Sequence, residues 1–270
     1  MTFTGASVEN KMVVVSGGGT GIGAAVARRY AAEGARVAIL GRRSDPLELV
    51  AAETGALPVV ADVSDTAQTR DAIARVADAL GAIDVLVANA GGHGFATVGE
   101  TADAEWDASL RANLSSAFVL TREALPHLIE SKGQIVIVSS LAGLFAGPSA
   151  AGYTVGKHAL IGLTRSLARD YGKNGVRVNA VCPGWVRTPM ADEEMDEFAR
   201  HAGITGRDEA YARVTADVPL GRPAEPVEIA SIVRFLGSGE SSIMTGTVIV
   251  ADGGAHIVDL PTLPFEHAGM

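Results

Sequence analysis

The sequence predicts an α/β protein: a doubly wound sheet of seven parallel strands with helices on both faces. Short apolar runs alternate with helical patterns along the chain. The runs are apolar throughout, which is typical of strands buried on both faces. The first run also leads through a glycine-rich turn into a helix. A chain of 270 residues with 47% hydrophobic content fits one large domain, residues 1–270.

The first unit combines a strand, a turn, a helix and a second strand. The β-branched run 12–16 predicts a buried strand, and glycines fill the turn 17–23. A helix is expected over 24–33, and a strand over 36–40. In this order, within about 30 residues, glycines allow the backbone to approach a pyrophosphate at the helix N-terminus. The alternative, a merely flexible turn, does not explain why a helix starts directly after buried strand residues.

The alternation continues to residue 250. Further strands are expected at 57–61, 83–88, 134–139, 176–181 and 247–250, and further helices at 65–80, 103–129, 152–171 and 226–236. Ligands of such sheets bind beyond the carboxyl ends of the strands. The residues that follow the strands therefore converge on one edge: Gly17 to Gly23, Gly41, Arg42, Asp62, Val63, Asn89 to Gly91, Ser139, Ser140, Pro183 and Gly184.

Two regions break the alternation. Residues 184–222 include an acidic stretch followed by glycines and prolines. This pattern fits a solvated insertion or a mobile lid over the strand ends, and both interpretations stay open. The segment 253–270 contains two prolines and no clear period, so an irregular C-terminal tail is expected.

Tyr153 and Lys157 stand four residues apart in an expected helix. That spacing puts their Cβ atoms about 6 Å apart on one face. A neighbouring ammonium favours a phenolate, so the tyrosine pKa is expected to fall from its usual value of about 10. Such a tyrosine is a candidate general acid/base. The pair alone would suit an ordinary surface helix, but Ser140 ends a strand thirteen residues before Tyr153.

Composition excludes several classes of partner. The net charge of −9 argues against nucleic-acid binding, which needs basic surface. No apolar run approaches the roughly 20 residues that cross a bilayer, and residues 1–11 lack the pattern of a secretion signal. The single cysteine, Cys182, fits a reducing compartment. A cytoplasmic protein is expected, with neither a nucleic-acid nor a membrane partner and no metal site.

With these residues in place, the chain resembles the short-chain dehydrogenase/reductase family from Val13 to about Gly254. The ordered matches are Gly17-x-x-x-Gly21-Ile22-Gly23, Asp62-Val63, Asn89-Ala90-Gly91, Asn113, Ser140, Tyr153-x-x-x-Lys157 and Pro183-Gly184-Trp185-Val186-Arg187-Thr188. The departures are Ser16 for threonine, Ala88 for asparagine, and Gly156 for a serine whose hydroxyl would lie near the cofactor. The resemblance implies a Rossmann fold and a nicotinamide cofactor.

The resemblance also implies roles for individual residues. Tyr153 would exchange a proton with the substrate oxygen, and Ser140 would hold that oxygen. Lys157 would bind the cofactor ribose and lower the tyrosine pKa, and Asn113 would anchor a water that links Lys157 to solvent. The implied cofactor-binding residues are Gly17, Gly19, Thr20, Gly21, Ile22, Gly23, Arg42, Asp62, Val63, Asn89, Ala90, Gly91, Tyr153, Lys157, Pro183, Gly184, Val186 and Thr188.

The end of the second strand bears on the choice of cofactor. NAD-preferring relatives carry an acid there, whereas this chain has Gly41 followed by Arg42 and Arg43. A guanidinium suits a 2′-phosphate, so NADP(H) is favoured and NAD(H) stays possible. The two arginines could also be solvated surface, and Thr20 in the glycine turn is not basic.

Substrate recognition is expected beyond strands four to six. Ser140, Leu141, Phe145, Tyr153 and Trp185 form the expected substrate site, with His93, Phe95, Leu144 and Met190 nearby. This mostly apolar set favours a hydrophobic ketone or secondary alcohol. His93 and Arg187 could meet a polar group, although such residues are more often solvated rim. A small carbonyl, a 3-oxoacyl thioester, a cyclic ketone and a steroid all stay open.

Three functions compete. The leading one is an NADP(H)-dependent ketone/alcohol oxidoreductase. The second is a 3-oxoacyl-thioester (acyl-carrier-protein) reductase, against which the negative charge argues mildly because its carrier partner is acidic. The third is a non-catalytic dinucleotide sensor or scaffold, which could dispense with Tyr153 and Lys157. By resemblance, a homotetramer is expected through the helices that hold Asn113 and Tyr153. A contact between the tail and a neighbouring subunit is a further hypothesis.

Overall fold

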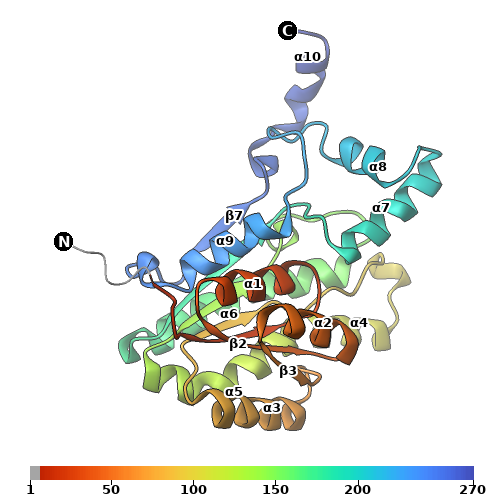
Figure 1. The fold of residues 1–270 in the computed structure, drawn as a ribbon. Coiled ribbons are helices and arrows are strands. Elements are labelled where there is room, and N and C mark those ends of the chain that lie inside the picture. The colour runs from red at the N-terminus through yellow and green to blue at the C-terminus, as the bar shows by residue number, and fades with distance from the viewer. Residues whose placement is uncertain (1–6) are drawn as a thin grey trace.

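Seven parallel strands form one sheet in the order β3-β2-β1-β4-β5-β6-β7 in the computed structural model, which describes residues 7–270. The strands are β1 (Met12–Ser16), β2 (Arg36–Gly41), β3 (Leu57–Val60), β4 (Val85–Ala88), β5 (Gln134–Val138), β6 (Arg177–Pro183) and β7 (Val248–Ala251). The predicted doubly wound parallel sheet is confirmed (Figure 1). Residues 1–6, part of the segment expected to lack a secretion signal, lie outside the described range.

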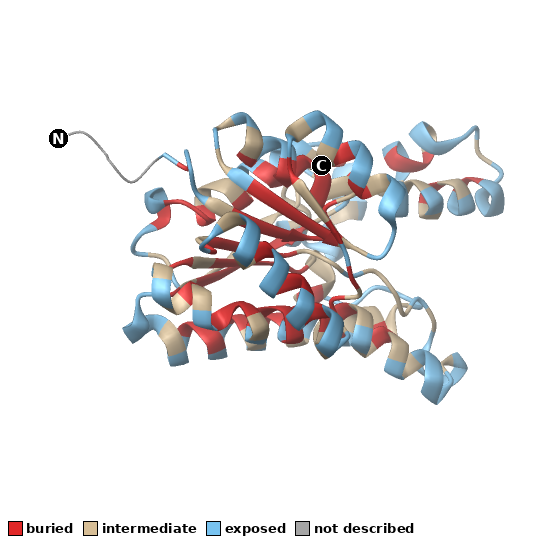
Figure 2. Cartoon of the chain, turned by 60° about the horizontal axis from the view of Figure 1, so that its bottom comes forward, coloured by how far each residue is buried: buried red, intermediate tan, exposed pale blue. Residues whose placement is uncertain are grey.

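Helices cover both faces of this sheet. They are α1 (Gly21–Ala32), α2 (Ser44–Thr54), α3 (Thr66–Leu80), α4 (Asp103–Leu110), α5 (Ser116–Ser131), α6 (Ala151–Tyr171), α7 (Pro189–Ala202), α8 (Arg207–Val214), α9 (Pro226–Leu236) and α10 (Leu263–His267). Helices α1, α2 and α9 contribute to one buried cluster, and α3, α5 and α6 to the other. Figure 2 shows buried strands between two helix layers whose outer faces are exposed.

Strand alternation divides the core between the two faces. In β1, Val14 packs into the cluster with α3, α5 and α6, whereas Val13 and Val15 pack into the cluster with α1, α2 and α9. Every one of these side chains is fully buried. Burial on both faces explains why the strands are apolar at each position rather than at every second one.

The long helix expected over 103–129 is not uniform. A π-helical turn, Arg111–Ser115, separates α4 from α5. Such turns insert a residue into the helical ladder and often lie at functional sites. Here the turn contains Asn113, which is fully buried.

The structure corrects the sequence-based expectations at α2 and in the tail, and it shows helices in the region 184–222. Helix α2 was not predicted, because it buries only Leu47 and Val50 and has no long apolar stripe. The region 184–222, expected to be an insertion or lid, contains α7 and α8. These two helices pack on each other through a separate buried cluster, Ala191, Met195, Ala199, Ala210 and Tyr211. The tail expected to be irregular contains two short 3₁₀ turns and α10.

Local polar contacts hold that tail. The Asp252 carboxylate accepts from the backbone N–H of His256 at 2.7 Å. His267 Nε2 lies 2.8 Å from Asp217 Oδ1, which ties α10 to the segment after α8. These side-chain contacts have no periodic signature, so the sequence pattern could not predict them.

Candidate active site

The glycine turn after β1 is packed too tightly for side chains. Gly17 has φ +66°, and a Cβ there would lie 2.8 Å from Asn89 Nδ2. A Cβ on Gly23 would lie 2.2 Å from the Gly17 carbonyl oxygen. The turn therefore brings bare backbone and the N-terminus of α1 to the edge of the sheet. This is the geometry that accepts a pyrophosphate.

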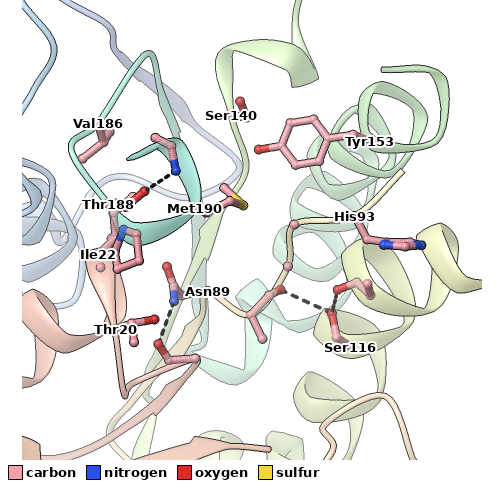
Figure 3. Close-up of a pocket in the computed structure, with 18 of the residues that line it drawn as sticks. Thr20, Ile22, Asn89, His93, Ser116, Ser140, Tyr153, Val186, Thr188 and Met190 are labelled. Carbon is pink, nitrogen blue, oxygen red and sulfur yellow. Dashed lines mark hydrogen bonds between the residues drawn. The ribbon is translucent and has the colours of Figure 1, made fainter. Parts of the chain in front are cut away.

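Ser16 and Asn89 join the ends of β1 and β4. Ser16 Oγ accepts from the backbone N–H groups of Asn89 at 3.0 Å and Ala90 at 3.1 Å. Asn89 Nδ2 donates to the Ser16 carbonyl oxygen at 3.0 Å. The serine that replaces the family threonine therefore keeps a hydroxyl bridge between two strand ends. Figure 3 shows Asn89 beside Thr20 and Ile22 in the glycine turn.

One large cavity of about 1370 Å³ runs along the carboxyl ends of the strands. Most of the predicted site residues line it: Gly17, Gly19, Thr20, Gly21, Ile22, Arg42, Asp62, Val63, Asn89, Ala90, Gly91, Ser140, Leu141, Phe145, Tyr153, Pro183, Gly184, Trp185, Val186 and Thr188. The convergence expected from the sheet topology is thus present. The glycine turn and Tyr153 belong to the same cavity, whose size and shape fit an extended dinucleotide beside a small substrate.

Tyr153 and Ser140 face each other across this cavity (Figure 3). The Tyr153 backbone N–H donates to the Gly94 carbonyl oxygen at 3.2 Å. Its ring packs 5.0 Å from the ring of Phe95. Ser140 Oγ accepts from the Ala142 N–H at 3.1 Å, whereas Ser139 is buried and donates to the Lys157 carbonyl oxygen. The side chains of the two adjacent serines thus point in different directions, as strand alternation predicts.

The expected fall in the Tyr153 pKa is wrong for the protein alone. Burial raises the pKa of the phenol, the Ser140 side chain lowers it, and the negative charge of Glu194 raises it. Lys157 does not outweigh these effects, although its Nζ lies 5.5 Å from the centre of the tyrosine ring. Burial lowers the pKa of Lys157 itself to about 8. Removal from water disfavours charge on both groups.

Three predicted site residues lie behind the cavity wall rather than on it: Gly23, Asn113 and Lys157. Lys157 is 4% exposed, and its Nζ donates to the Val138 carbonyl oxygen at 3.1 Å. Asn113 Oδ1 accepts from the Gly92 N–H at 2.8 Å, and its Nδ2 donates to the His93 carbonyl oxygen at 2.8 Å. Asn113 thus fixes the loop after β4, a positioning contact that sequence spacing alone could not distinguish from a catalytic one.

Gly156, the departure beside Lys157, also has a packing reason. A Cβ at this position would lie 2.7 Å from the Cβ of Asn113. Helix α6 therefore approaches the π-helical turn closely only because residue 156 has no side chain. The hydroxyl that the family usually carries there would not fit this spacing without movement.

The substrate end of the cavity is largely apolar, as predicted. Its walls include His93, Phe95, Leu141, Phe145, Trp185 and Met190, but not Leu144. Arg187 does not face this space. Its guanidinium pairs with Asp208 at 2.8 Å and lies 4.5 Å from the centre of the Tyr211 ring. Sequence reasoning missed Glu194 and Arg111 among the lining residues, because neither stands at a strand end.

Arg42 and Arg43 lie at the other end of the cavity, directly after β2. Both are exposed, and neither side chain makes a hydrogen bond or an ion pair with another residue in the range 7–270. Asp62, also at this end, accepts hydrogen bonds from the N–H and the hydroxyl of Ser64. A phosphate near Arg42 would therefore meet an uncommitted guanidinium.

The lid, which we define as α7 and α8, is anchored to the glycine turn. Thr188 Oγ1 caps α7 by accepting from the Ala191 N–H at 3.2 Å, and its methyl side packs against Gly21. Arg207 joins the two helices through Asp192 at 2.9 Å and Asp196 at 2.5 Å. The first turn of α7 is thereby held beside the cavity.

Comparisons with known proteins agree with this geometry. Residues 17–256 match the family model described as enoyl-(acyl carrier protein) reductase. The chain is 49% identical over 257 residues to protein MoaE of Klebsiella aerogenes, a match that covers 94% of this chain and 99% of that protein. It is 39% identical over 254 residues to meso-2,3-butanediol dehydrogenase of Serratia marcescens, covering 93% and 96% of the two chains.

The fold also matches a solved enzyme. The crystal structure of levodione reductase superposes with a TM-score of 0.88 at 33% sequence identity, and the match covers 93% of this chain and 99% of that one. Among the helices of residues 7–270, none has the length and hydropathy needed to cross a membrane. In the same range, no three His, Cys, Asp or Glu side chains gather in a way that could hold a metal ion.

Proposed function

The chain belongs to the short-chain dehydrogenase/reductase family and is an NAD(P)-linked oxidoreductase that acts on CH–OH groups, and on this premise we propose that Tyr153 is its general acid/base in an NADP(H)-dependent interconversion of a ketone and a secondary alcohol. One observation carries the proposal: the hydroxyls of Tyr153 and Ser140 face each other in a cavity that continues to the glycine turn.

When bound, the nicotinamide cofactor would supply the hydride in reduction and accept it in oxidation. The chain's own residues manage the oxygen. In reduction, Tyr153 donates its proton to the oxygen as negative charge develops there, and Ser140 donates a hydrogen bond to the same atom. The raised pKa of Tyr153 keeps the phenol protonated at neutral pH, the form that reduction requires.

Lys157 and Asn113 act around this pair. The resemblance assigns Lys157 to the cofactor ribose. Its Nζ donates one hydrogen bond to the Val138 carbonyl oxygen, which leaves two further N–H donors for that contact. Asn113 orients the loop after β4 through its bonds to Gly92 and His93. We propose that both are positioning residues for Tyr153 and the cofactor.

The preference for NADP(H) rests on Arg42. Its uncommitted guanidinium lines the cavity after β2, where Gly41 leaves room and replaces the acid that NAD-preferring relatives carry at the end of this strand. A guanidinium donates two parallel hydrogen bonds to phosphate oxygens, which favours the phosphorylated cofactor.

The apolar walls favour a ketone or secondary alcohol with a hydrophobic body. Levodione reductase and meso-2,3-butanediol dehydrogenase, to which the chain is similar, are named for the reduction of a carbonyl compound and the oxidation of a secondary alcohol. A second candidate, a 3-oxoacyl-thioester reductase, is supported by 35% identity over 253 residues to the 3-oxoacyl-(acyl-carrier-protein) reductase of Thermotoga maritima. The net charge of −9 would repel an acidic carrier protein, so we place this candidate second.

Substitution of Tyr153 by Phe tests the proposal. The variant should lose at least about a hundredfold in kcat, the usual contribution of a positioned acid/base. Cofactor affinity, measured by fluorescence titration, should change little because the ring remains. Turnover should first be sought in a screen of ketones, alcohols and 3-oxoacyl thioesters with both cofactors. A Tyr153→Phe enzyme with native kcat would refute the assignment.

We also propose a homotetramer in the cytoplasm. Helices α5 and α6, expected to hold the subunits together, carry the exposed apolar side chains Phe118 and Val155. Burial of such groups between subunits is favourable. Cys182, a buried free thiol in β6, suits a reducing compartment.

A further inference from the structure

Glu194 is a carboxylate at the substrate end of the cavity that the proposed reaction does not use. It lies in α7, four residues after Met190, so both side chains share the helix face that lines the cavity. Figure 3 places Met190 beside the Ser140 and Tyr153 pair. The charge of Glu194 is close enough to Tyr153 to raise the pKa of the phenol. The carboxylate therefore shares this cavity with the Ser140 and Tyr153 pair.

No cation of the described chain neutralises Glu194. Arg207 pairs with Asp192 and Asp196, and Arg187 pairs with Asp208 and Glu225. Arg111 also lines the cavity, but it does not lower the pKa of Glu194. Within residues 7–270, the Glu194 carboxylate makes neither a hydrogen bond nor an ion pair. Its charged neighbour is another acid, Glu197, which together with burial raises the pKa of Glu194. A partly buried carboxylate in this setting is stabilised by a cation from outside the chain.

The walls around this end of the cavity are aromatic. Phe95, Phe145 and Trp185 line it together with Glu194, and each is partly exposed to the cavity or its mouth. Aromatic faces attract an ammonium through their quadrupole, and a carboxylate forms a charge-assisted hydrogen bond with it. A neutral substrate hydroxyl would form a hydrogen bond with the carboxylate but would not be attracted to the faces of the aromatic rings. The combination is therefore selective for a positively charged nitrogen.

We propose that Glu194 is a specificity-determining residue that selects substrates bearing an ammonium group close to the reacting carbinol or carbonyl carbon, so that the enzyme acts on amino alcohols and amino ketones. This inference rests on the proposed function, because it assigns the substrate class of the same cavity. Glu194 binds the ammonium, the aromatic walls surround it, and Ser140 and Tyr153 hold the oxygen.

Matched alcohols test the inference on the native enzyme. In 1-amino-2-propanol and 2-butanol, and likewise in 2-amino-1-phenylethanol and 1-phenyl-1-propanol, an ammonium and a methyl group occupy equivalent positions. Initial rates of oxidation are measured near pH 7, where the amines are protonated, with both cofactors. In at least one pair, kcat/KM should be about tenfold or more higher for the charged member, the value of one charge-assisted hydrogen bond.

Two variants locate the effect. Glu194→Gln keeps the shape of the side chain and removes its charge, so the charged-to-neutral ratio of kcat/KM should fall about tenfold. Glu193→Gln is the matched control, because Glu193 is exposed, does not line the cavity and stands on the same helix. It should keep the native ratio.

The outcomes separate this inference from the proposed function. Turnover of the neutral alcohols without preference for their charged partners overturns the role of Glu194 and leaves the oxidoreductase intact. A charged-to-neutral ratio of kcat/KM that is equal in the native enzyme and in Glu194→Gln also overturns the role of Glu194 and leaves the oxidoreductase intact. If neither these alcohols nor the broader ketone and alcohol screen gives turnover, the proposed function fails and this inference fails with it.

Discussion

Replacing Lys157 by methionine measures what it costs to bury this ammonium beside the reacting tyrosine. The side chain is 4% exposed, and burial lowers its pKa from 10.5 to about 8. The folded chain thus binds this proton less tightly than the unfolded chain does. The charge therefore destabilises the folded state below pH 8, and this cost disappears as the pH rises toward 10.5.

The difference between the two pKa values corresponds to about 3 kcal/mol, since one pKa unit equals roughly 1.4 kcal/mol. Methionine fills a similar volume without charge but loses the hydrogen bond from Nζ to the Val138 carbonyl oxygen, which contributes about 1 kcal/mol. We therefore expect Lys157→Met to unfold with a free energy about 2 kcal/mol higher than the native protein at pH 7. The advantage should shrink between pH 8 and 10.5 and reverse above that range.

The assay is urea unfolding at pH 7, 9 and 10.5, followed by tryptophan fluorescence at one protein concentration. Lys173→Met is the control, because Lys173 is exposed and the same change there removes no buried charge. The Lys157 variant should also lose turnover at every pH if the proposed function is right. A variant that is less stable than the native protein at pH 7, or a stability difference that does not vary with pH, would refute the reasoning.

Three further predictions follow from the cavity and its surroundings. Arg42→Ala should lower kcat/KM with NADP(H) about tenfold or more, because a charge-assisted hydrogen bond to the phosphate is lost. The kcat/KM with NAD(H) should change far less. A native enzyme with a higher kcat/KM for NAD(H) than for NADP(H) would contradict the role of Arg42. Gly156→Ser should destabilise the fold by about 1–3 kcal/mol, since its Cβ meets Asn113, and an unchanged melting temperature would show that the two helices separate freely. Light scattering should give four times the chain mass of 27.7 kDa, and a monomer at working concentration would exclude the proposed assembly.

The strands, and with them the residues that follow their carboxyl ends, were predictable because burial on both faces of the sheet makes each strand apolar at every position. Residues such as Val13, Val14 and Val15 are apolar regardless of the helix they meet. The cavity followed from topology, since parallel strands bring their carboxyl ends together. Helix α2 could not be found in this way, because two buried residues in eleven leave no readable period.

The electrostatics of the site could not be predicted from spacing. A separation of four residues places Lys157 and Tyr153 on one helix face, but it does not show that the ammonium turns to the Val138 carbonyl oxygen. Nor does it show that burial dominates both pKa values. Glu194 was missed for a related reason: its place in the cavity depends on how α7 packs, and no motif marks it.

The lid has a consequence for how this enzyme could diversify. The five buried side chains that join α7 to α8 form a cluster apart from the two clusters that flank the sheet, and Figure 1 shows both helices standing away from the strands. A substitution within this cluster changes the packing of α7 against α8 and removes no side chain from the two clusters beside the sheet. The helical pair can therefore vary in sequence more independently than the helices that cover the strands.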